Sequence, residues 1–193
     1  DGIHHWFADG KMNTCHMALD YHVNNGLSEK AALIYDSPVT NTIKTYSYRE
    51  LRDETAKCAG MLKEHGIGKG DRVIIYMPMI PQAAIAMLAC ARLGAIHSVV
   101  FGGFAASELA VRIDDAKPKL IMSASCGIEV NSIISYKPLL DSAIEKAQYK
   151  PKSCIIYQRE QHLAKLTDGR DFDWKSCCDA ASPANCVEVN GDD

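Results

Sequence analysis

Two adjacent glycines, Gly102 and Gly103, stand between an apolar run and a helical pattern in the stretch GAIHSVVFGGFAASELAVRIDDA. The apolar run predicts a strand, which places the pair at the carboxyl end of that strand and before a helix. In open parallel sheets, ligands bind at this edge. Glycine lets the backbone approach a ligand, and a helix N-terminus favours anions. A plain turn is the ordinary alternative for such a pair. The residues alone therefore predict only a candidate ligand edge.

Other residues that carry chemistry show no catalytic or metal-binding spacing. The sequence contains no G-x-G-x-x-G, Walker A or G-x-S-x-G motif. None of its seven histidines forms an H-E-x-x-H pattern, and His97, inside an apolar run, is interpreted as a core or rim residue. Asp114 and Asp115 are adjacent on a helix, so their side chains diverge and are interpreted as a solvated helix end. We predict no catalytic residue and no metal ligand in this chain.

The composition limits the partners and the compartment. With 47% hydrophobic and 23% charged residues, the chain is typical of a soluble globular protein, and its net charge of -3 gives no reason to expect nucleic acid. No apolar stretch reaches the roughly 20 residues that span a bilayer, so we expect no membrane partner. The eight cysteines match no zinc pattern and include no C-x-x-C, which predicts free thiols in a reducing compartment.

The elements that must position the glycines alternate between strand and helix. Apolar runs at VIIYM, AIHSVVF, KLIMSA and SCIIYQ predict strands. Helices are predicted near residues 47–65, 80–93, 106–115 and 137–147, the last of them after Pro138. This alternation predicts a parallel α/β sheet, flanked by helices, from about Val73 to Tyr157. Ser47 and Glu50 form an S-x-x-E capping box for the first helix, and Gly66 lies at its C-terminal cap.

The two ends of the chain differ from this core. We assign residues 1–45 to an amino-terminal segment containing a helix, with Asn13 as its cap, and a hairpin formed by AALIYD and TIKTYSY. Residues 46–193 are assigned to the first α/β subdomain. From Asp168 onward the periodicity is lost, and we predict loop or a short helix. Neither end resembles a natural terminus, so we expect the chain to be a fragment.

The same residues resemble the amino-terminal region of the acyl-CoA synthetases of the adenylate-forming (AMP-binding) superfamily. The motifs that carry the resemblance are WF, Y-x-E-L, G-D-R-V, Y-M-P, G-A-I-H-S-V-V-F-G-G-F and R-I-x-D-A, and they cover nearly the whole chain. The opening HHWFADGKMNTCHMALDYHV is similar to the short-chain branch, although Ala8, Asp9 and Met12 depart from its usual pattern. The resemblance implies the fold of this superfamily, here incomplete.

Within the short-chain branch, the chain resembles the propionyl-CoA synthetases. The stretch CGIE, from Cys126 to Glu129, and the stretch YKPLLD, from Tyr136 to Asp141, match that type. The resemblance implies activation of a short-chain carboxylate, propionate or acetate, in two steps. ATP and the acid give an acyl-adenylate and pyrophosphate, and the thiol of coenzyme A then displaces AMP. The full-length enzyme would use ATP, coenzyme A and Mg2+.

The resemblance also implies which residues contact coenzyme A. Phe101, Gly102 and Gly103 correspond to the segment that lines the site of its nucleotide. Glu129, Val130, Asn131 and Ser132 correspond to the stretch that contacts its phosphate. Members of the family usually have Pro-Gly-Arg at the last three positions of this stretch, whereas this chain has Val130, Asn131 and Ser132. The arginine that could pair with a phosphate is therefore missing.

The family's phosphate loop, acyl pocket and catalytic lysine would follow residue 193, so the chain alone is expected to be inactive. The alternative is a truncated, non-catalytic binding module, and the transcript beyond codon 193 would distinguish the two. Relatives of this type imply the mitochondrial matrix, with the cytoplasm as the alternative.

Overall fold

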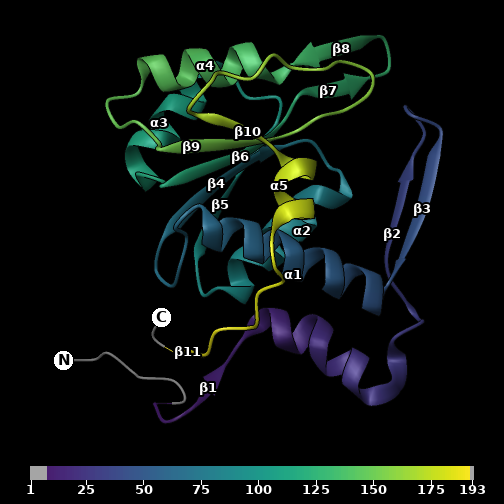
Figure 1. Cartoon of the computed structure of the whole chain (residues 1–193). Helices are drawn as coiled ribbons and strands as arrows, with labels where there is room; N and C mark the ends of the chain where they lie inside the picture. Colours follow the sequence, from purple (N-terminus) through teal and green to yellow (C-terminus); the bar gives the residue numbers. More distant parts are fainter. Residues whose placement is uncertain (1–7, 192–193) are drawn as a thin grey trace.

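A parallel sheet of five strands forms the centre of the computed structural model, which describes residues 8–191 (Figure 1). The order of the strands is β10-β9-β6-β4-β5, and every pair is parallel. Their bounds are β4 (Arg72–Met77), β5 (Ile96–Phe101), β6 (Leu120–Ala124), β9 (Ser153–Tyr157) and β10 (Asp171–Asp173). The predicted parallel core is confirmed. The loss of periodicity after Asp168 hid β10, which continues the sheet beyond Tyr157.

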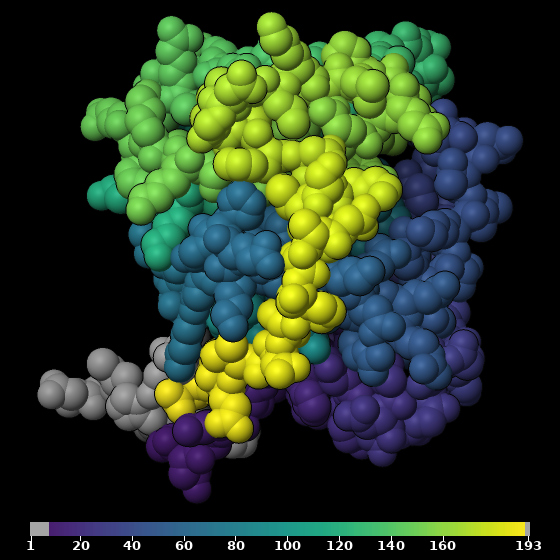
Figure 2. Space-filling view, viewed as in Figure 1, coloured from purple at the N-terminus to yellow at the C-terminus, as the bar shows by residue number. Residues whose placement is uncertain are grey.

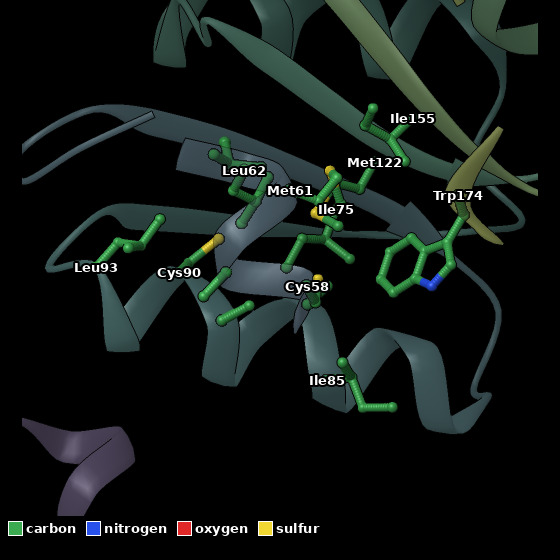
Figure 3. Packing of buried hydrophobic residues seen from close by; sticks show 14 of the residues in the cluster. Cys58, Met61, Leu62, Ile75, Ile85, Cys90, Leu93, Met122, Ile155 and Trp174 are labelled. Carbon is green, nitrogen blue, oxygen red and sulfur yellow. The ribbon is translucent and has the colours of Figure 1, made fainter. Parts of the chain in front are cut away.

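Helices cover both faces of the sheet because β4 alternates its side chains between them. Val73, Ile75 and Met77 join one core with α1 (Tyr48–Glu64), α2 (Pro81–Arg92) and α5 (Trp174–Ala180). Figure 3 shows part of this core, with Trp174 of α5 facing Ile75. Ile74 and Tyr76 join a second core with α3 (Ala106–Ala116) and α4 (Tyr136–Lys146). The result is a three-layer α/β arrangement.

The predicted ends of the helices are mostly confirmed. Ser47 and Glu50 form the reciprocal capping box of α1, and Gly66 takes a φ of 79° just past its end. α4 spans Tyr136–Lys146, in agreement with the helix predicted near residues 137–147, but it begins before Pro138 rather than after it. Proline is tolerated there because the N–H groups of a first helical turn have no intrahelical partner.

The amino-terminal part packs under this core. The Oδ1 atom of Asn13 accepts a hydrogen bond from the N–H of His16 at 3.0 Å, which confirms Asn13 as a cap. The helix contains two π-helical turns, η1 (His16–Asp20) and η2 (Val23–Leu27), which the pattern did not predict. The hairpin of β2 (Ala31–Ser37) and β3 (Thr42–Ser47) is confirmed. In Figure 1 it stands at the side of the molecule, beyond one end of α1.

Two further strand pairs were not predicted. Strands β7 (Cys126–Glu129) and β8 (Ser132–Ser135) form a hairpin directly before α4. Strands β1 (Lys11–Met12) and β11 (Val189–Asn190) pair antiparallel and join an early segment of the chain to a late one (Figure 1). All eight cysteines are free thiols, as predicted. Among residues 8–191, no helix is long and apolar enough to cross a membrane.

The segment from Ala181 to Glu188, which we call the C-terminal strap, crosses α1 and α2. The N–H of Ala184 donates to the carbonyl of Ala56 at 2.9 Å, and that of Val187 donates to the carbonyl of Arg92 at 2.8 Å. A Cβ atom on Gly60 would lie 1.9 Å from the carbonyl oxygen of Ser182. The glycine in α1 therefore provides the room in which the strap lies.

Candidate coenzyme A site

The predicted glycine pair lies at the carboxyl end of β5, immediately before α3. Phe101 is the last residue of β5, and α3 begins at Ala106. Neither Gly102 nor Gly103 has a positive φ, so the backbone does not need glycine for its conformation. What matters at both positions is the space that a side chain would fill.

The two glycines have different neighbours. Gly103 is exposed, and a Cβ there would lie 2.7 Å from Cε1 of Phe101, a residue that is 66% exposed. Gly102 is buried, and a Cβ there would lie 2.4 Å from the hydroxyl oxygen of Tyr136. A ligand edge requires both glycines to face solvent or a cleft, which is true of Gly103 and not of Gly102. The space beside Gly102 is taken by the protein's own Tyr136.

Beside Gly103, three side chains form an open shelf that consists of Phe101, Phe104 and Arg112. The rings of Phe101 and Phe104 meet edge to face with their centroids 5.9 Å apart. The guanidinium carbon of Arg112 lies 5.5 Å from the centroid of the Phe104 ring. An exposed aromatic ring suits stacking by a flat base, and an exposed cation suits a phosphate. Phe104 and Arg112 were not predicted as site residues from the sequence, although Arg112 belongs to the R-I-x-D-A motif.

The second predicted stretch forms the tip of the β7–β8 hairpin. Glu129 ends β7, Val130 and Asn131 form the turn, and Ser132 begins β8. All four residues are exposed, and the hydroxyl of Ser132 donates to a carboxylate oxygen of Glu129 at 3.3 Å. The tip therefore carries a carboxylate and a hydroxyl but no cation. Electrostatically, it is less suited to a phosphate than a tip that ends in arginine.

A separate hollow of about 780 Å³ lies at the same edge of the sheet, between the β2–β3 hairpin, the start of α2 and α5. Its lining includes Lys44, Glu54, Gln82, Arg159 and Trp174, and none of the seven predicted site residues. Burial raises the pKa of Glu54, although Lys44 opposes the shift. Figure 2 shows this face, with the hairpin in dark blue beside the yellow residues of α5. The hollow is open and is lined by both polar and apolar side chains, and it is distinct from the shelf.

One cluster has the donor types of a metal site but already surrounds a cation. Cys15, Asp20 and Cys186 bring their ligand atoms within 4.8 Å of one another. The guanidinium of Arg92 donates to both carboxylate oxygens of Asp20, at 2.7 and 3.0 Å, and to the sulfur of Cys15 at 3.5 Å. Burial raises the pKa of both thiols, that of Cys186 to about 12, which disfavours the thiolates that metals bind. The cluster is therefore an anchor for Arg92.

The remaining candidates have structural explanations. Asp114 accepts a hydrogen bond from the N–H of Tyr149 at 2.8 Å, and the backbone N–H groups of Tyr149 and Gln148 lower its pKa. His97 is half-buried in β5, and this burial lowers its pKa. His97 thus agrees with its interpretation as a core or rim residue, whereas the interpretation as a solvated helix end is correct for the exposed Asp115 and wrong for Asp114, which accepts a backbone hydrogen bond from the loop after α4.

Known proteins that resemble this chain show the family to which it belongs. The family model described as "AMP-binding enzyme" matches residues 20–189, and the chain belongs to this family. An acyl-CoA synthetase of Brucella canis has the same fold, with a TM-score of 0.76 and 23% identity over 95% of this chain and 30% of that one. The α/β sheet with its flanking helices is thus the amino-terminal part of this fold.

Relatives with higher identity include a short-chain acyl-CoA synthetase and a propionate–CoA ligase. The human protein "Acyl-CoA synthetase short-chain family member 3, mitochondrial" is 50% identical over 95% of this chain and 27% of its own length. The "Propionate--CoA ligase" of Escherichia coli is 48% identical over 89% of this chain and 27% of its own. An uncharacterised protein of Pseudomonas aeruginosa is 59% identical over the whole chain and 31% of its own length. The chain thus spans about three-tenths of these relatives.

Proposed function

We propose that this chain is the amino-terminal part of an AMP-forming short-chain acyl-CoA synthetase. The whole protein would activate propionate, or acetate, with ATP and pass the acyl group to coenzyme A. The observation that carries the proposal is the 48–50% identity to a propionate–CoA ligase and a short-chain acyl-CoA synthetase along 89–95% of this chain. The family model supports the use of a nucleotide, since it describes an AMP-binding enzyme.

In this proposal the chain supplies contacts to coenzyme A. The adenine end would lie on Phe101 and against the backbone of Gly103, whose missing side chain leaves room for it. Gly102 would not contact the ligand, because the space beside it is filled by the ring of Tyr136. The tip from Glu129 to Ser132 would lie near a phosphate, to which the Ser132 hydroxyl can donate one neutral hydrogen bond. In the second step the thiol sulfur forms a bond to the acyl carbon, the bond from that carbon to the AMP oxygen breaks, and the thiol proton is released.

The groups that stabilise charge on the reacting phosphates would come from residues beyond 193, as would the contacts to Mg2+. Such electrostatic groups contribute the largest share of catalysis in many enzymes. We therefore expect residues 1–193 alone to show no propionate-dependent exchange of pyrophosphate into ATP. The division into residues 1–45 and 46–193 likewise stays a prediction.

The test uses the full-length protein with purified propionate, ATP and coenzyme A. It should exchange pyrophosphate into ATP when propionate is present, and form propionyl-CoA and AMP when coenzyme A is added. Gly103→Val should raise the apparent KM for coenzyme A while the exchange reaction continues. An unchanged KM in a folded variant would remove Gly103 from the site, and no exchange by the wild-type protein would refute the proposed activity.

For the compartment we propose the mitochondrial matrix, with the cytoplasm as the alternative. The human relative carries the word mitochondrial in its name, whereas the name of the Escherichia coli relative does not. Cell fractionation with an antibody against the chain would decide between them. Recovery with a matrix marker supports the proposal, and recovery in the cytosolic fraction supports the alternative.

A further inference from the structure

One aromatic ring lies between the two segments that the proposed function assigns to coenzyme A. Tyr136 is the first residue of α4 and is 4% exposed. A Cβ on Gly102 would lie 2.4 Å from its hydroxyl oxygen, and a Cβ on Gly127 would lie 2.6 Å from the same atom. The ring is therefore packed directly against the backbone of the β5–α3 turn on one side and of β7 on the other.

The ring is held in this position from two further directions. The N–H of Tyr136 donates to the carbonyl of Ser125 at 3.0 Å, which fixes the start of α4 to the end of β6. The ring of Tyr76, in β4, lies 5.1 Å away at an angle of 31°. The hydroxyl of Tyr76 donates to the carbonyl of Phe104 at 3.0 Å, so the same aromatic pair also binds the β5–α3 turn.

The contacts on Tyr136 come from the predicted segments themselves. Gly102 lies between Phe101 and Gly103 in sequence, and Gly127 lies two residues before Glu129 on the hairpin that ends in Ser132. A rigid ring packed against both backbones sets the distance between them, because protein interiors are close-packed and transmit such displacements. A smaller side chain at residue 136 would let the shelf and the hairpin tip shift relative to each other.

We propose that Tyr136 is a positioning residue for coenzyme A, which sets the separation between the shelf at Phe101–Gly103 and the hairpin tip at Glu129–Ser132. The inference rests on the proposed function, since it needs coenzyme A to contact both segments. A misplacement of about 1 Å at a binding group can cost as much as 100-fold in rate. The adenylation step does not involve coenzyme A, so it should not depend on this separation.

The experiment compares the two half-reactions in the full-length protein. Tyr136→Leu removes the ring, Tyr136→Phe keeps it, and Leu140→Ala is the matched control. Leu140 lies one turn further along α4 and is fully buried in the same core. The measurements are the KM for coenzyme A in propionyl-CoA formation and the rate of propionate-dependent pyrophosphate exchange without coenzyme A.

We expect Tyr136→Leu to raise the KM for coenzyme A about tenfold or more and to leave the exchange rate within about twofold, given the cost of misplacement. Tyr136→Phe should change neither value by more than about twofold, because the ring sets the spacing. Leu140→Ala should lower the thermal midpoint without a selective rise in the KM for coenzyme A. If Tyr136→Leu is insoluble, Gly127→Ala displaces the ring from the other side. It should likewise raise the KM for coenzyme A and leave the exchange rate unchanged.

Two results would overturn the inference while leaving the proposed function intact. One is an equal loss of exchange and thioester formation in Tyr136→Leu, which would indicate a purely structural role. The other is an unchanged KM for coenzyme A in a folded variant that lacks the ring. A wild-type protein that shows no propionate-dependent exchange would refute the proposed function instead, so the two failures are distinguishable.

Discussion

Replacing Asp20 by asparagine should loosen the amino-terminal helix from the rest of the domain. Asp20 is the counter-ion of Arg92, and their side chains are only 17% and 6% exposed. The guanidinium also donates to the carbonyl of Ala184 in the C-terminal strap at 2.7 Å. One buried cation therefore joins the amino-terminal helix, α2 and the strap. Asp20→Asn leaves that cation without its charge partner.

The magnitude follows from the cost of an unpaired buried charge. Removing one partner of a buried ion pair costs about 3–5 kcal/mol. Because Asp20 is partly solvated and asparagine still accepts one hydrogen bond, we take about 3 kcal/mol, the low end of that range. Each 1.4 kcal/mol is a factor of ten, so local opening should become about 100-fold more frequent. Asn13, which donates to the carbonyl of Val187 at 2.7 Å, remains to hold the strap.

Native-state hydrogen exchange of the full-length protein measures this opening segment by segment. The amides of residues 16–27 should exchange about 100-fold faster in Asp20→Asn, while those of β4 and β6 should change little. Asp179→Asn is the control, because Asp179 pairs with Lys175 on the surface, where both side chains are more than half exposed. Exposed pairs contribute at most about 1 kcal/mol. Equal effects from the two substitutions would contradict the argument.

Three further changes have definite expected outcomes. Gly60→Ala should lower stability by about 1–2 kcal/mol in urea unfolding, because displacement of the strap carbonyl outweighs the gain of about 1 kcal/mol in helix propensity; an unchanged midpoint would show that the strap moves freely. Ser132→Arg should lower the KM for coenzyme A about threefold to tenfold by adding a charged phosphate contact, with Ser132→Gln as the neutral control. Asp171 concerns acid stability: burial alone would raise its pKa, but hydrogen bonds from Arg170, the N–H of Thr167 and Lys137 outweigh it and lower the pKa. Its contribution is therefore complete above the unfolded pKa of about 4 and is lost as pH falls through the lower folded value. The gap between the thermal midpoints of wild type and Asp171→Asn should narrow progressively as pH falls below about 4, and a gap that stays constant there would contradict this assignment.

The parallel core was predictable because its signals are local. Four apolar runs, a capping box and a C-terminal glycine act within a few residues of the element that they define. The missed strands lack such signals. β10 consists of Asp171, Phe172 and Asp173, and two carboxylates in three residues do not resemble a buried strand. In the hairpin of β7 and β8, Val130 and Asn131 form the turn without glycine or proline, so the usual turn signal is missing.

The ionic anchor could not be predicted from the sequence. Asp20 and Arg92 are 72 residues apart, and Cys186 is 166 residues from Asp20. Each residue on its own has the appearance of an ordinary surface charge or a small apolar residue. Only the packing of the amino-terminal helix against α2 brings them together, and burial then requires the pairing. Long-range contacts of this kind depend on the fold rather than on any local pattern.

For the glycine pair, the local sequence predicts the position in the fold but not which of the two residues is accessible to a ligand. The sequence places Gly102 and Gly103 correctly at the end of a strand, but it predicts the same role, contact with a ligand, for both. In the structure the two glycines differ in which atoms occupy the space that a side chain would fill. Beside Gly102 that space holds the ring of Tyr136, which is 34 residues later in the chain. Beside Gly103 the nearest atoms belong to the exposed ring of Phe101, which can turn away. The open position is therefore the one that a ligand can use, and the filled position is the one that fixes the turn for it.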